Sequence, residues 1–168
     1  MNKTNLRMSI RQVTTAALIA ALYVVLTYVS NMLSLSSGVI QCRLSEALCI
    51  LPVFTFSAVP GLFVGCLISN LLCSGVILDV VFGSIATLIG AFGTYLLAKK
   101  ISNIFVLTLP TVFSNAIIIP FVLKYAYALD GAYLFFVATV GAGEIISSTV
   151  LGSFLYSYLK NKKNILFK

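Results

Sequence analysis

Long stretches without a charged side chain limit what this chain can fold into. Four of them contain no Asp, Glu, Lys or Arg: residues 12–42, 47–78, 80–98 and 101–123. Residues 131–159 contain one charge, Glu144. A helix of about 20 apolar residues crosses a hydrocarbon core of about 30 Å. Charged residues make up only 9% of the chain, against about 25% in ordinary soluble domains. The sequence therefore predicts an all-α integral membrane protein, with residues 1–168 forming a single membrane domain.

Positive charges gather at three places along the chain. Nine of the eleven Lys and Arg residues form three clusters: Lys3/Arg7/Arg11, Lys99/Lys100 and Lys160/Lys162/Lys163/Lys168. Basic segments beside membrane spans stay on the cytoplasmic side. We therefore expect both termini and the 99–100 loop to be cytoplasmic. Because the basic residues flank apolar spans instead of forming a stripe, the net charge of +7 indicates anionic lipid headgroups, not nucleic acid, as the partner.

The number of spans follows from the positions of the basic clusters. If the N-terminus and Lys99 are both cytoplasmic, the chain must cross the membrane an even number of times between them. We divide residues 47–78 at Val59-Pro60-Gly61, because Pro removes a backbone donor and Gly tolerates turn geometry. The first span is too long for a signal-peptide core, so we expect it to be retained. This predicts six transmembrane helices, at about residues 12–33, 44–58, 60–76, 79–98, 103–123 and 132–159.

Two polar side chains are predicted to lie deep in the bilayer. At about 1.5 Å per residue, Asn115 lies about 18 Å from the helix start at Asn103, and Glu144 about 18 Å from Ala132. Both are then near the midplane on adjacent helices. An ionisable group there costs on the order of 3 kcal/mol or more, which makes Glu144 a functional candidate. No Lys or Arg sits at its depth in the sequence, so we expect its carboxylate to pair with a ligand.

Four further polar residues have both a structural and a functional interpretation. Asn70 lies in the outer half of the third span, Asp79 at the outer end of the fourth, and Arg43 and Glu46 where the outer loop enters the second. Arg43 and Glu46 fit an i,i+3 ion pair, and Asp79 fits a helix N-cap. The asparagines fit interhelical packing. These interpretations stay open beside a role in binding.

Small residues line three of the predicted helices, with Gly83, Gly90 and Gly93 on the fourth. Gly61 and Gly65 form a G-x-x-x-G pair, which favours packing inside the chain. The first helix carries two overlaid A-x-x-x-A pairs, made by Ala16, Ala17, Ala20 and Ala21. For this alanine face, internal packing and contact with a partner subunit both remain open.

The sequence gives little support to catalysis. Histidine is absent, and no Ser or Cys is paired with an evident base. The four cysteines lack the spacing of a zinc site. A G-x-x-x-x-G-K-[ST] motif for ATP is also missing. We expect a protein that is not an enzyme and that uses no metal or cofactor.

One run of residues is more specific than the rest. The run Gln41-Cys42-Arg43-Leu44-Ser45-Glu46-Ala47-Leu48 resembles the QueT family, as do Leu51-Pro52, Gly61 to Asn70, Asp79-Val80-Val81-Phe82-Gly83-Ser84, Pro110 to Asn115 and Gly143-Glu144. That family comprises substrate-binding S components of bacterial energy-coupling-factor transporters, proposed to take up queuosine precursors. The resemblance spans nearly the whole chain. It implies a six-helix bundle in the bacterial cell membrane, with a substrate pocket near the outer face under the first outer loop.

The resemblance also implies a substrate and the residues that bind it. Queuosine precursors are 7-deazaguanines, whose guanine-like edge presents an N–H and an amino group that one carboxylate accepts together. We assign Glu144 to this edge. The other expected binding residues are Asn115 at another ring atom, Asp79 or Glu46 near the substrate amine, Gln41 and Arg43 in the loop lid, Tyr125 and Tyr127 stacked on the base, and Asn70 without an assigned contact.

The implied partners are a transmembrane coupling subunit and two ATPase subunits. By resemblance, Ala16 and Ala20, or Ala17 and Ala21 one residue later, would dock onto the coupling subunit. Two alternatives remain open: an S component for riboflavin, thiamine or biotin, and a self-contained secondary transporter with Glu144 as a proton relay.

Overall fold

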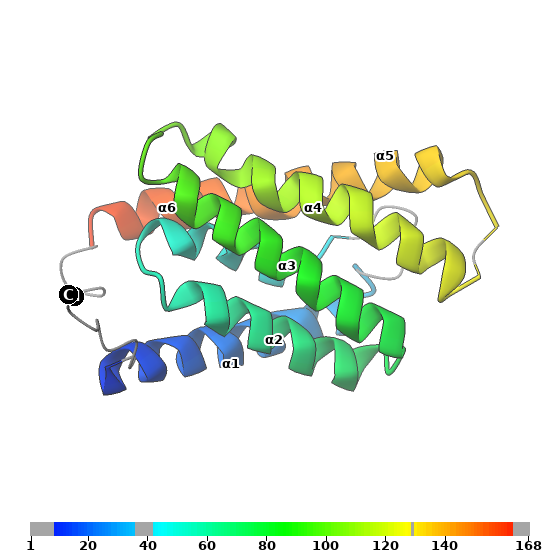
Figure 1. Cartoon of the computed structure of the whole chain (residues 1–168), viewed down its shortest axis with the longest axis horizontal. Coiled ribbons are helices and arrows are strands. Elements are labelled where there is room, and N and C mark those ends of the chain that lie inside the picture. Colours follow the sequence, from blue (N-terminus) through cyan, green and yellow to red (C-terminus); the bar gives the residue numbers. More distant parts are fainter. Residues whose placement is uncertain (1–8, 36–41, 129, 163–168) are drawn as a thin grey trace, which may run out of the picture.

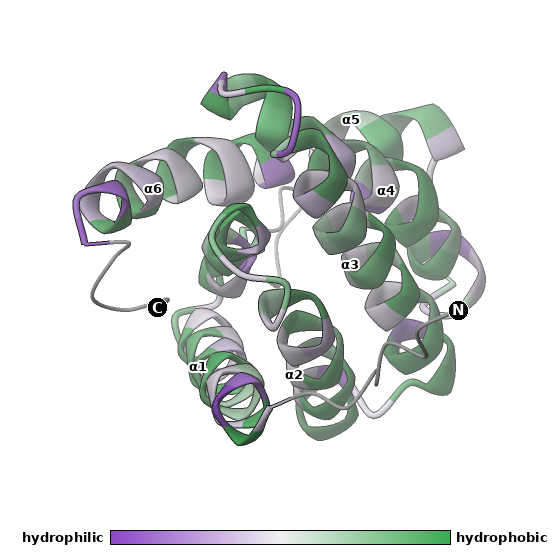
Figure 2. Cartoon of the chain, turned by 60° about the vertical axis from the view of Figure 1, so that its left-hand side comes forward, coloured by the Kyte–Doolittle hydropathy of each residue, from purple (hydrophilic) through white to green (hydrophobic). Residues whose placement is uncertain are grey.

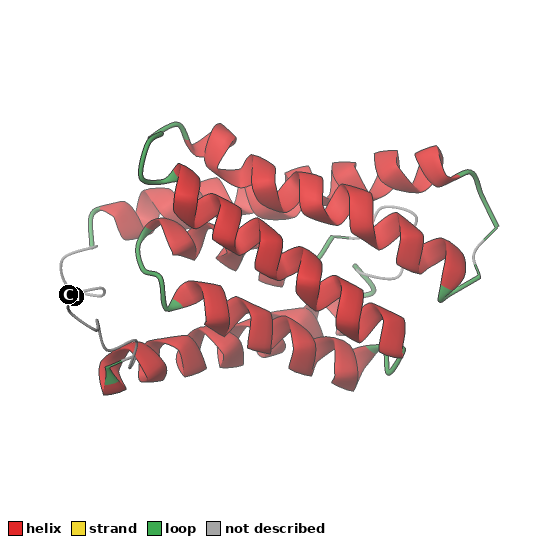
Figure 3. Ribbon diagram, in the orientation of Figure 1, coloured by secondary structure: helices red, strands yellow, loops and turns green. Residues whose placement is uncertain are grey.

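The computed structural model describes residues 9–35, 42–128 and 130–162, and within these ranges every regular element is a helix (Figure 3). The predicted all-helical membrane fold is confirmed. The elements are α1 (Ile10–Met32), η1 (Leu44–Val53), α2 (Ala58–Cys73), α3 (Ile77–Leu97), α4 (Ile104–Tyr125), α5 (Tyr133–Glu144), η2 (Ile145–Leu151) and α6 (Gly152–Lys160).

The helices lie lengthwise beside one another, and the chain reverses direction at each loop (Figure 1). The last three elements form one continuous rod. The start of α1 and the end of α6 lie at the same end of the bundle, as an even number of crossings requires. Four segments are long and apolar enough to cross a membrane: Ile10–Met32, Ile77–Leu97, Ile104–Tyr125 and Tyr133–Lys160. That η1 and α2 also cross, and that the shared end is cytoplasmic, stay predictions.

The second predicted span differs from its expected form. Instead of a helix over residues 44–58, η1 is a 3-10 helix that ends at Val53. The chain then turns, and α2 begins at Ala58. The break therefore lies before Pro60, which occupies the first turn of α2. A first-turn N–H has no partner within the helix, so proline is tolerated at this place.

The two glycines of α2 bring α1 and α2 into close contact, as predicted for internal packing. A Cβ added to Gly61 would lie 2.6 Å from the carbonyl oxygen of Ala16. One added to Gly65 would lie 2.8 Å from Cβ of Tyr23 and 3.0 Å from Cα of Ala20. Only a residue without a side chain allows backbones to approach this closely.

Two prolines inside α4 are accommodated by hydroxyl groups of neighbouring segments. Thr94 of α3 donates to the carbonyl of Leu107 at 2.9 Å, one turn before Pro110. Tyr133 donates to the carbonyl of Ile117 at 2.6 Å, one turn before Pro120. Hydroxyls that bond carbonyls near a proline make such residues tolerable within a membrane helix.

The outward faces of the helices are mainly apolar, and hydrophilic residues concentrate at the ends and inside the bundle (Figure 2). Large apolar side chains remain exposed along the bundle, including Leu18 at 61% and Phe113 at 59%. A surface of this kind is suited to lipid contact, and the interior is left for polar groups.

We expect Gly65→Ala to destabilise the protein, because the new methyl group would overlap Tyr23 and force α1 away from α2. Overpacking of this kind costs about 1–3 kcal/mol, measurable as a lower thermal midpoint in detergent. Gly141→Ala is the matched control, since the nearest atom to its added Cβ lies 3.8 Å away. Equal midpoints for the two variants would contradict the proposed close contact.

Candidate substrate-binding site

Polar residues that are far apart in sequence come together inside the bundle. They come from five elements: Arg43 and Glu46 at the start of η1, Asn70 in α2, Asp79 in α3, Asn115 in α4 and Glu144 in α5. Each carboxylate and amide among them is at most 8% exposed. Gln41, the seventh residue predicted for the site, lies outside the described residues.

A narrow cavity lies between η1, α3, α4 and α5. Its lining residues are Arg43, Glu46, Gly83, Thr87, Asn115, Ile119, Val140 and Glu144. The walls enclose about 330 Å³ including the mouth, but only about 10 Å³ of this admits the centre of a water-sized sphere. That is room for about one water molecule. A heterocycle therefore enters only if the lining side chains move apart.

Arg43 is held by two other helices at one side of the cavity. Its Nη1 donates to Oδ1 of Asn70 at 3.3 Å, and its Nη2 lies 3.9 Å from Oδ2 of Asp79. Asn70 Nδ2 donates to the Asp79 carbonyl at 3.2 Å. Arg43 therefore forms an ion pair with Asp79. Within the described chain it forms none with Glu46, contrary to the i,i+3 interpretation. Asp79 lies in the first turn of α3, whose N-cap is Val76.

Glu46 is satisfied by neutral donors. The hydroxyl of Tyr23 donates to its Oε1, and the thiol of Cys49 donates to its Oε2 at 3.1 Å. Its side chain forms no salt bridge within the described ranges. The charge of this buried carboxylate is thus solvated by hydrogen bonds without a cation in direct contact.

Tyr23 is the first of three polar residues of α1 that bond to successive residues at the start of η1. The hydroxyls of Thr27 and Ser45 lie 2.8 Å apart, and Ser30 Oγ accepts the N–H of Leu44 at 2.9 Å. Tyr23, Thr27 and Ser30 are spaced i, i+4, i+7, hence on one face of α1. We call these three residues the polar face of α1. It fixes Glu46 relative to α1.

Glu144 and Asn115 carry the unpartnered groups of the cavity. By distance and angle, neither Oε2 of Glu144 nor Nδ2 of Asn115 makes a hydrogen bond among the residues that the structure describes, although the two side chains lie close enough to interact with each other. Glu144 also has no salt bridge in those ranges, although Arg43 lines the same cavity. Buried polar atoms without a partner are rare, and each calls for an explanation such as a ligand.

The helix that carries Glu144 changes geometry directly after it. Residues Ile145–Leu151 form a π-helix, η2. Its hydrogen-bond neighbours come from the segment before η1 and from α4: Ser147 Oγ lies 3.1 Å from Sγ of Cys42, and Thr149 Oγ1 lies 2.9 Å from Oγ1 of Thr108. Wide helical turns of this kind occur frequently at functional sites.

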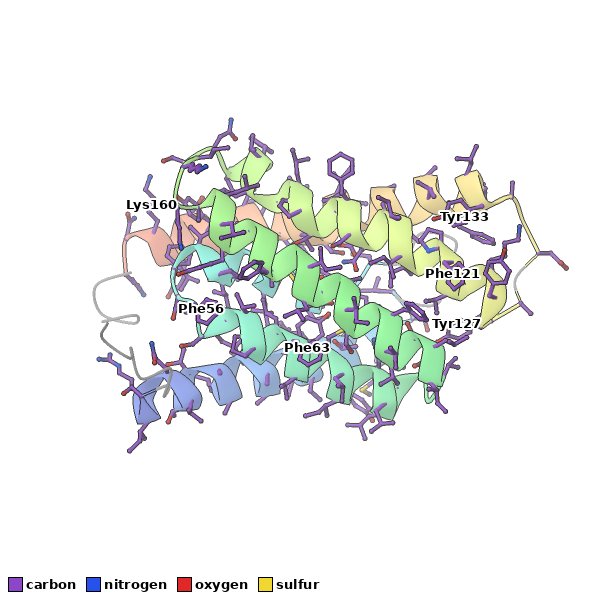
Figure 4. The ribbon with its side chains drawn as sticks, in the orientation of Figure 1. Phe56, Phe63, Phe121, Tyr127, Tyr133 and Lys160 are labelled. Atoms are coloured by element: carbon purple, nitrogen blue, oxygen red, sulfur yellow. The ribbon has the colours of Figure 1, made fainter. Side chains whose placement is uncertain are left out.

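The two tyrosines expected to stack on a base lie at the end of the bundle opposite Lys160 (Figure 4). Tyr127 donates its hydroxyl to Oδ2 of Asp79 at 3.0 Å. Burial and the Asp79 carboxylate raise the pKa of Tyr127, so it stays protonated as a donor. Tyr125 is 63% exposed and packs on Phe121, with ring centroids 4.5 Å apart. Neither lines the cavity, and their stacking on a base stays a prediction.

Sequence reasoning missed several residues of the site. Tyr23 and Cys49 bond Glu46 directly, and Gly83 and Thr87 of α3 line the cavity. The polar face of α1 was a usable signal, because three polar residues at helical spacing in an apolar span point to a buried partner. Gly83 and Thr87 lie one and two turns after Asp79. Their helical spacing from that acid was the corresponding signal in α3.

The structure separates the two alanine registers of α1. Ala16 and Ala20 contact the glycines of α2 within the chain. Ala17 and Ala21 are exposed. Docking of a partner through Ala16 and Ala20 would require α2 to move away, so the exposed register is the better candidate.

The described chain combines four apolar helices long enough to cross a membrane with a cluster of buried acids and amides, an interior that suits a small polar solute. The family model described as QueT transporter matches residues 13–161, and the chain belongs to this family of multi-pass membrane transporters. The family consists of transporters and not of enzymes.

One curated relative matches part of the chain. "Queuosine precursor transporter QueT" of Lactococcus lactis subsp. cremoris (strain MG1363) is 39% identical over 77 residues, which are 46% of this chain and 45% of that protein. The matched region thus spans less than half of the relative's length. No solved structure shows significant similarity to the chain. Within the described residues, no group of three His, Cys, Asp or Glu side chains is placed to hold a metal ion.

We expect Tyr23→Phe to lower the free energy of unfolding, since the buried Glu46 carboxylate loses a donor while the ring is retained. Leaving a buried charged acceptor short of a donor costs about 1–3 kcal/mol, measurable by thermal unfolding in detergent. Tyr28→Phe on the same helix is the control, because Tyr28 is 59% exposed. A similar loss in both variants would contradict a specific role of the Tyr23 hydroxyl.

Proposed function

We propose that this chain is the S component of an energy-coupling-factor transporter, the subunit that binds a queuosine precursor for uptake. Family membership and the name of the Lactococcus relative support this substrate class. The observation that carries the proposal is the pair of unpartnered groups, Glu144 Oε2 and Asn115 Nδ2, at one buried cavity. They offer an acceptor and a donor to a single polar ligand.

The chemistry of a 7-deazaguanine suits these two groups. Its ring N–H and exocyclic amino group lie side by side, and both donate to the carboxylate of Glu144 in our assignment. The ring carbonyl accepts from the amide of Asn115. Ile119 and Val140, which line the same cavity, give the flat ring an apolar contact. Ligand contacts of this kind replace the missing hydrogen bonds and account for the placement of two polar groups among apolar helices.

The charge distribution favours a precursor that carries an amine. Of the two acids expected near the amine, Glu46 lines the cavity. Asp79 is instead tied to Arg43 and Tyr127. Because Glu46 is bonded only to neutral donors in the described chain, a substrate ammonium would supply the cation that it lacks. We therefore assign Glu46 to the aminomethyl group of the precursor.

Closure and energy supply follow from the same assignment. Arg43, bridged to Asn70 and Asp79, holds the entry of η1 over the cavity, and we assign it, with Gln41, to the lid. The chain has no ATP-binding motif of its own, and in our proposal two ATPase subunits and a coupling subunit in the cell membrane provide the energy. We place the contact with the coupling subunit at Ala17 and Ala21, the exposed register of α1.

The test of the substrate site is Glu144→Gln. The variant keeps the size of the side chain but loses the charge, and hydrogen bonds to charged groups are worth about 1.5–3 kcal/mol. We expect the affinity for an aminomethyl-7-deazaguanine to fall roughly 10- to 150-fold, measured by isothermal titration or by ligand-induced thermal stabilisation. Asp130→Asn removes one acid from an exposed position and should leave the affinity unchanged.

A panel of 7-deazaguanines, riboflavin, thiamine and biotin identifies the substrate class in the same assay. Stabilisation by a vitamin alone would overturn the queuosine-precursor proposal and favour another S component. Undiminished binding by Glu144→Gln would remove this residue from the site. Uptake by the purified chain in liposomes, without any ATPase, would instead indicate a secondary transporter.

The docking face is tested by Ala21→Leu. We expect the larger side chain to reduce co-purification with the coupling subunit while substrate affinity stays unchanged, because Ala21 is exposed and does not line the cavity. Ala138→Leu is the control, since Ala138 is an exposed alanine of α5. Loss of assembly in both variants, or in neither, would contradict docking through this register.

A further inference from the structure

A second cavity lies at the basic end of the bundle, remote from the substrate site. It is formed where η1 ends and α3 ends, and its lining residues are Pro52, Val53, Phe54, Thr55, Phe56, Tyr95, Ala98 and Lys99. About 360 Å³ of it admits the centre of a water-sized sphere, far more than in the substrate cavity. Figure 4 shows Phe56 and Lys160 at this end, with Tyr127 at the other.

One wall of this cavity combines a fixed cation with hydroxyl groups. Nζ of Lys99 lies 4.4 Å from the centroid of the Tyr95 ring, and Phe56 packs edge-on against that ring at 5.0 Å. The cation–π contact holds the ammonium at the cavity wall. Thr55 Oγ1 accepts the N–H of Ser57 at 3.3 Å, which leaves its own hydroxyl hydrogen to donate. Together these groups offer several donors to one anion.

The charge of the surrounding end favours an anionic occupant. Lys100 follows Lys99 in sequence, and Lys160 and Lys162 close the last helix at the same end. The four acids of the chain lie elsewhere: Glu46 and Glu144 at the substrate cavity, Asp79 at the opposite end of α3, and Asp130 in the α4–α5 loop. A phosphate group therefore meets attraction here and no neighbouring acidic side chain of the described residues.

An exposed apolar stripe of α3 leads to Lys99. Ile85, Ile89, Phe92 and Leu96 are 39–52% exposed and recur at helical spacing, with Lys99 one turn after Leu96. Because α3 ends at Leu97, the stripe runs to the end of the helix that precedes Lys99, whose ammonium lies over the neighbouring Tyr95 ring. An extended hydrocarbon chain can lie along it while a headgroup occupies the cavity.

We propose that this cavity binds one anionic phospholipid, with the phosphate at Lys99, Thr55 and Tyr95 and an acyl chain along the stripe of α3. Basic pockets between transmembrane helices are suited to such headgroups. A zwitterionic lipid brings an ammonium into a cationic region, and free phosphate lacks the apolar part that the stripe accommodates. The site is separate from the substrate cavity and is independent of its assignment.

The test uses the purified full chain in a neutral detergent. Phosphatidylglycerol, phosphatidylcholine of matched acyl chains, and inorganic phosphate are titrated while the thermal midpoint is recorded, and native mass spectrometry counts retained lipid. We expect phosphatidylglycerol to stabilise the protein most. Lys99→Gln should weaken its binding about five-fold, the effect of one basic residue near an anionic surface. Lys99→Arg should restore binding.

Two further variants keep the result interpretable. Lys124→Gln removes an exposed cation at the other end of the bundle and should leave lipid binding unchanged. Thr55→Val removes only a hydroxyl and should weaken binding even if Lys99→Gln fails to fold. Equal stabilisation by both lipids, equal stabilisation by inorganic phosphate, or undiminished binding in the Thr55 and Lys99 variants would overturn the proposal. A Lys99→Gln effect on subunit assembly alone would overturn it in favour of a protein partner.

Discussion

A carboxylate buried among apolar helices must find its hydrogen-bond donors inside the bundle, and Glu46 finds them in Tyr23 and Cys49. Without such donors, a buried charge costs several kcal/mol. This requirement fixes the start of η1 relative to the polar face of α1. With Glu46 bonded to Tyr23, Ser45 lies beside Thr27 and Leu44 beside Ser30, one and two turns further along α1. Apolar packing alone would not fix the alignment of η1 along α1. In a membrane, lipid tails contact a helix as favourably as apolar side chains do. The position of Arg43, and hence the wall of the cavity, follows from the same alignment.

The two segments that depart from α-helical geometry meet at the cavity. The 3-10 helix η1 carries Glu46, and the π-helix η2 begins directly after Glu144. They contact each other, and Cys42, just before η1, lies 3.1 Å from Ser147 of η2. A tight helix and a wide one present side chains at different angles from a regular α-helix. Together they bring two acids to one cavity, which holds about one water. Widening it for a heterocycle therefore involves both irregular segments.

Charge and hydropathy predicted the helical class, and the G-x-x-x-G spacing predicted the internal packing of the α2 glycines. Helix geometry predicted that Glu144 and Asn115 line one site, because equal distances from the ends of antiparallel helices give equal depth. The geometry of residues 44–58 was not predictable, since this nearly charge-free run has no periodicity that separates a 3-10 helix from an α-helix. Pro60 was ambiguous for a related reason: a proline that breaks a helix and one in a first turn look alike in sequence. The two alanine pairs of α1 differ in direction by only about 100° around the helix axis. The sequence therefore could not show which pair packs against α2.

The first helix has two faces with different tasks in this arrangement. Its polar face bonds Glu46 at the substrate cavity, whereas Ala17 and Ala21 are exposed. Between them, Ala16 and Ala20 fix the helix to α2 through contacts too close to slide freely. We propose that the coupling subunit binds the exposed face of α1. A tilt of α1 caused by this binding would then move Glu46 as well, because the Tyr23 hydroxyl bonds Glu46 directly. Substrate affinity and subunit assembly are then linked through one helix, and thermodynamic reciprocity requires that a bound substrate alters docking as much as docking alters substrate binding.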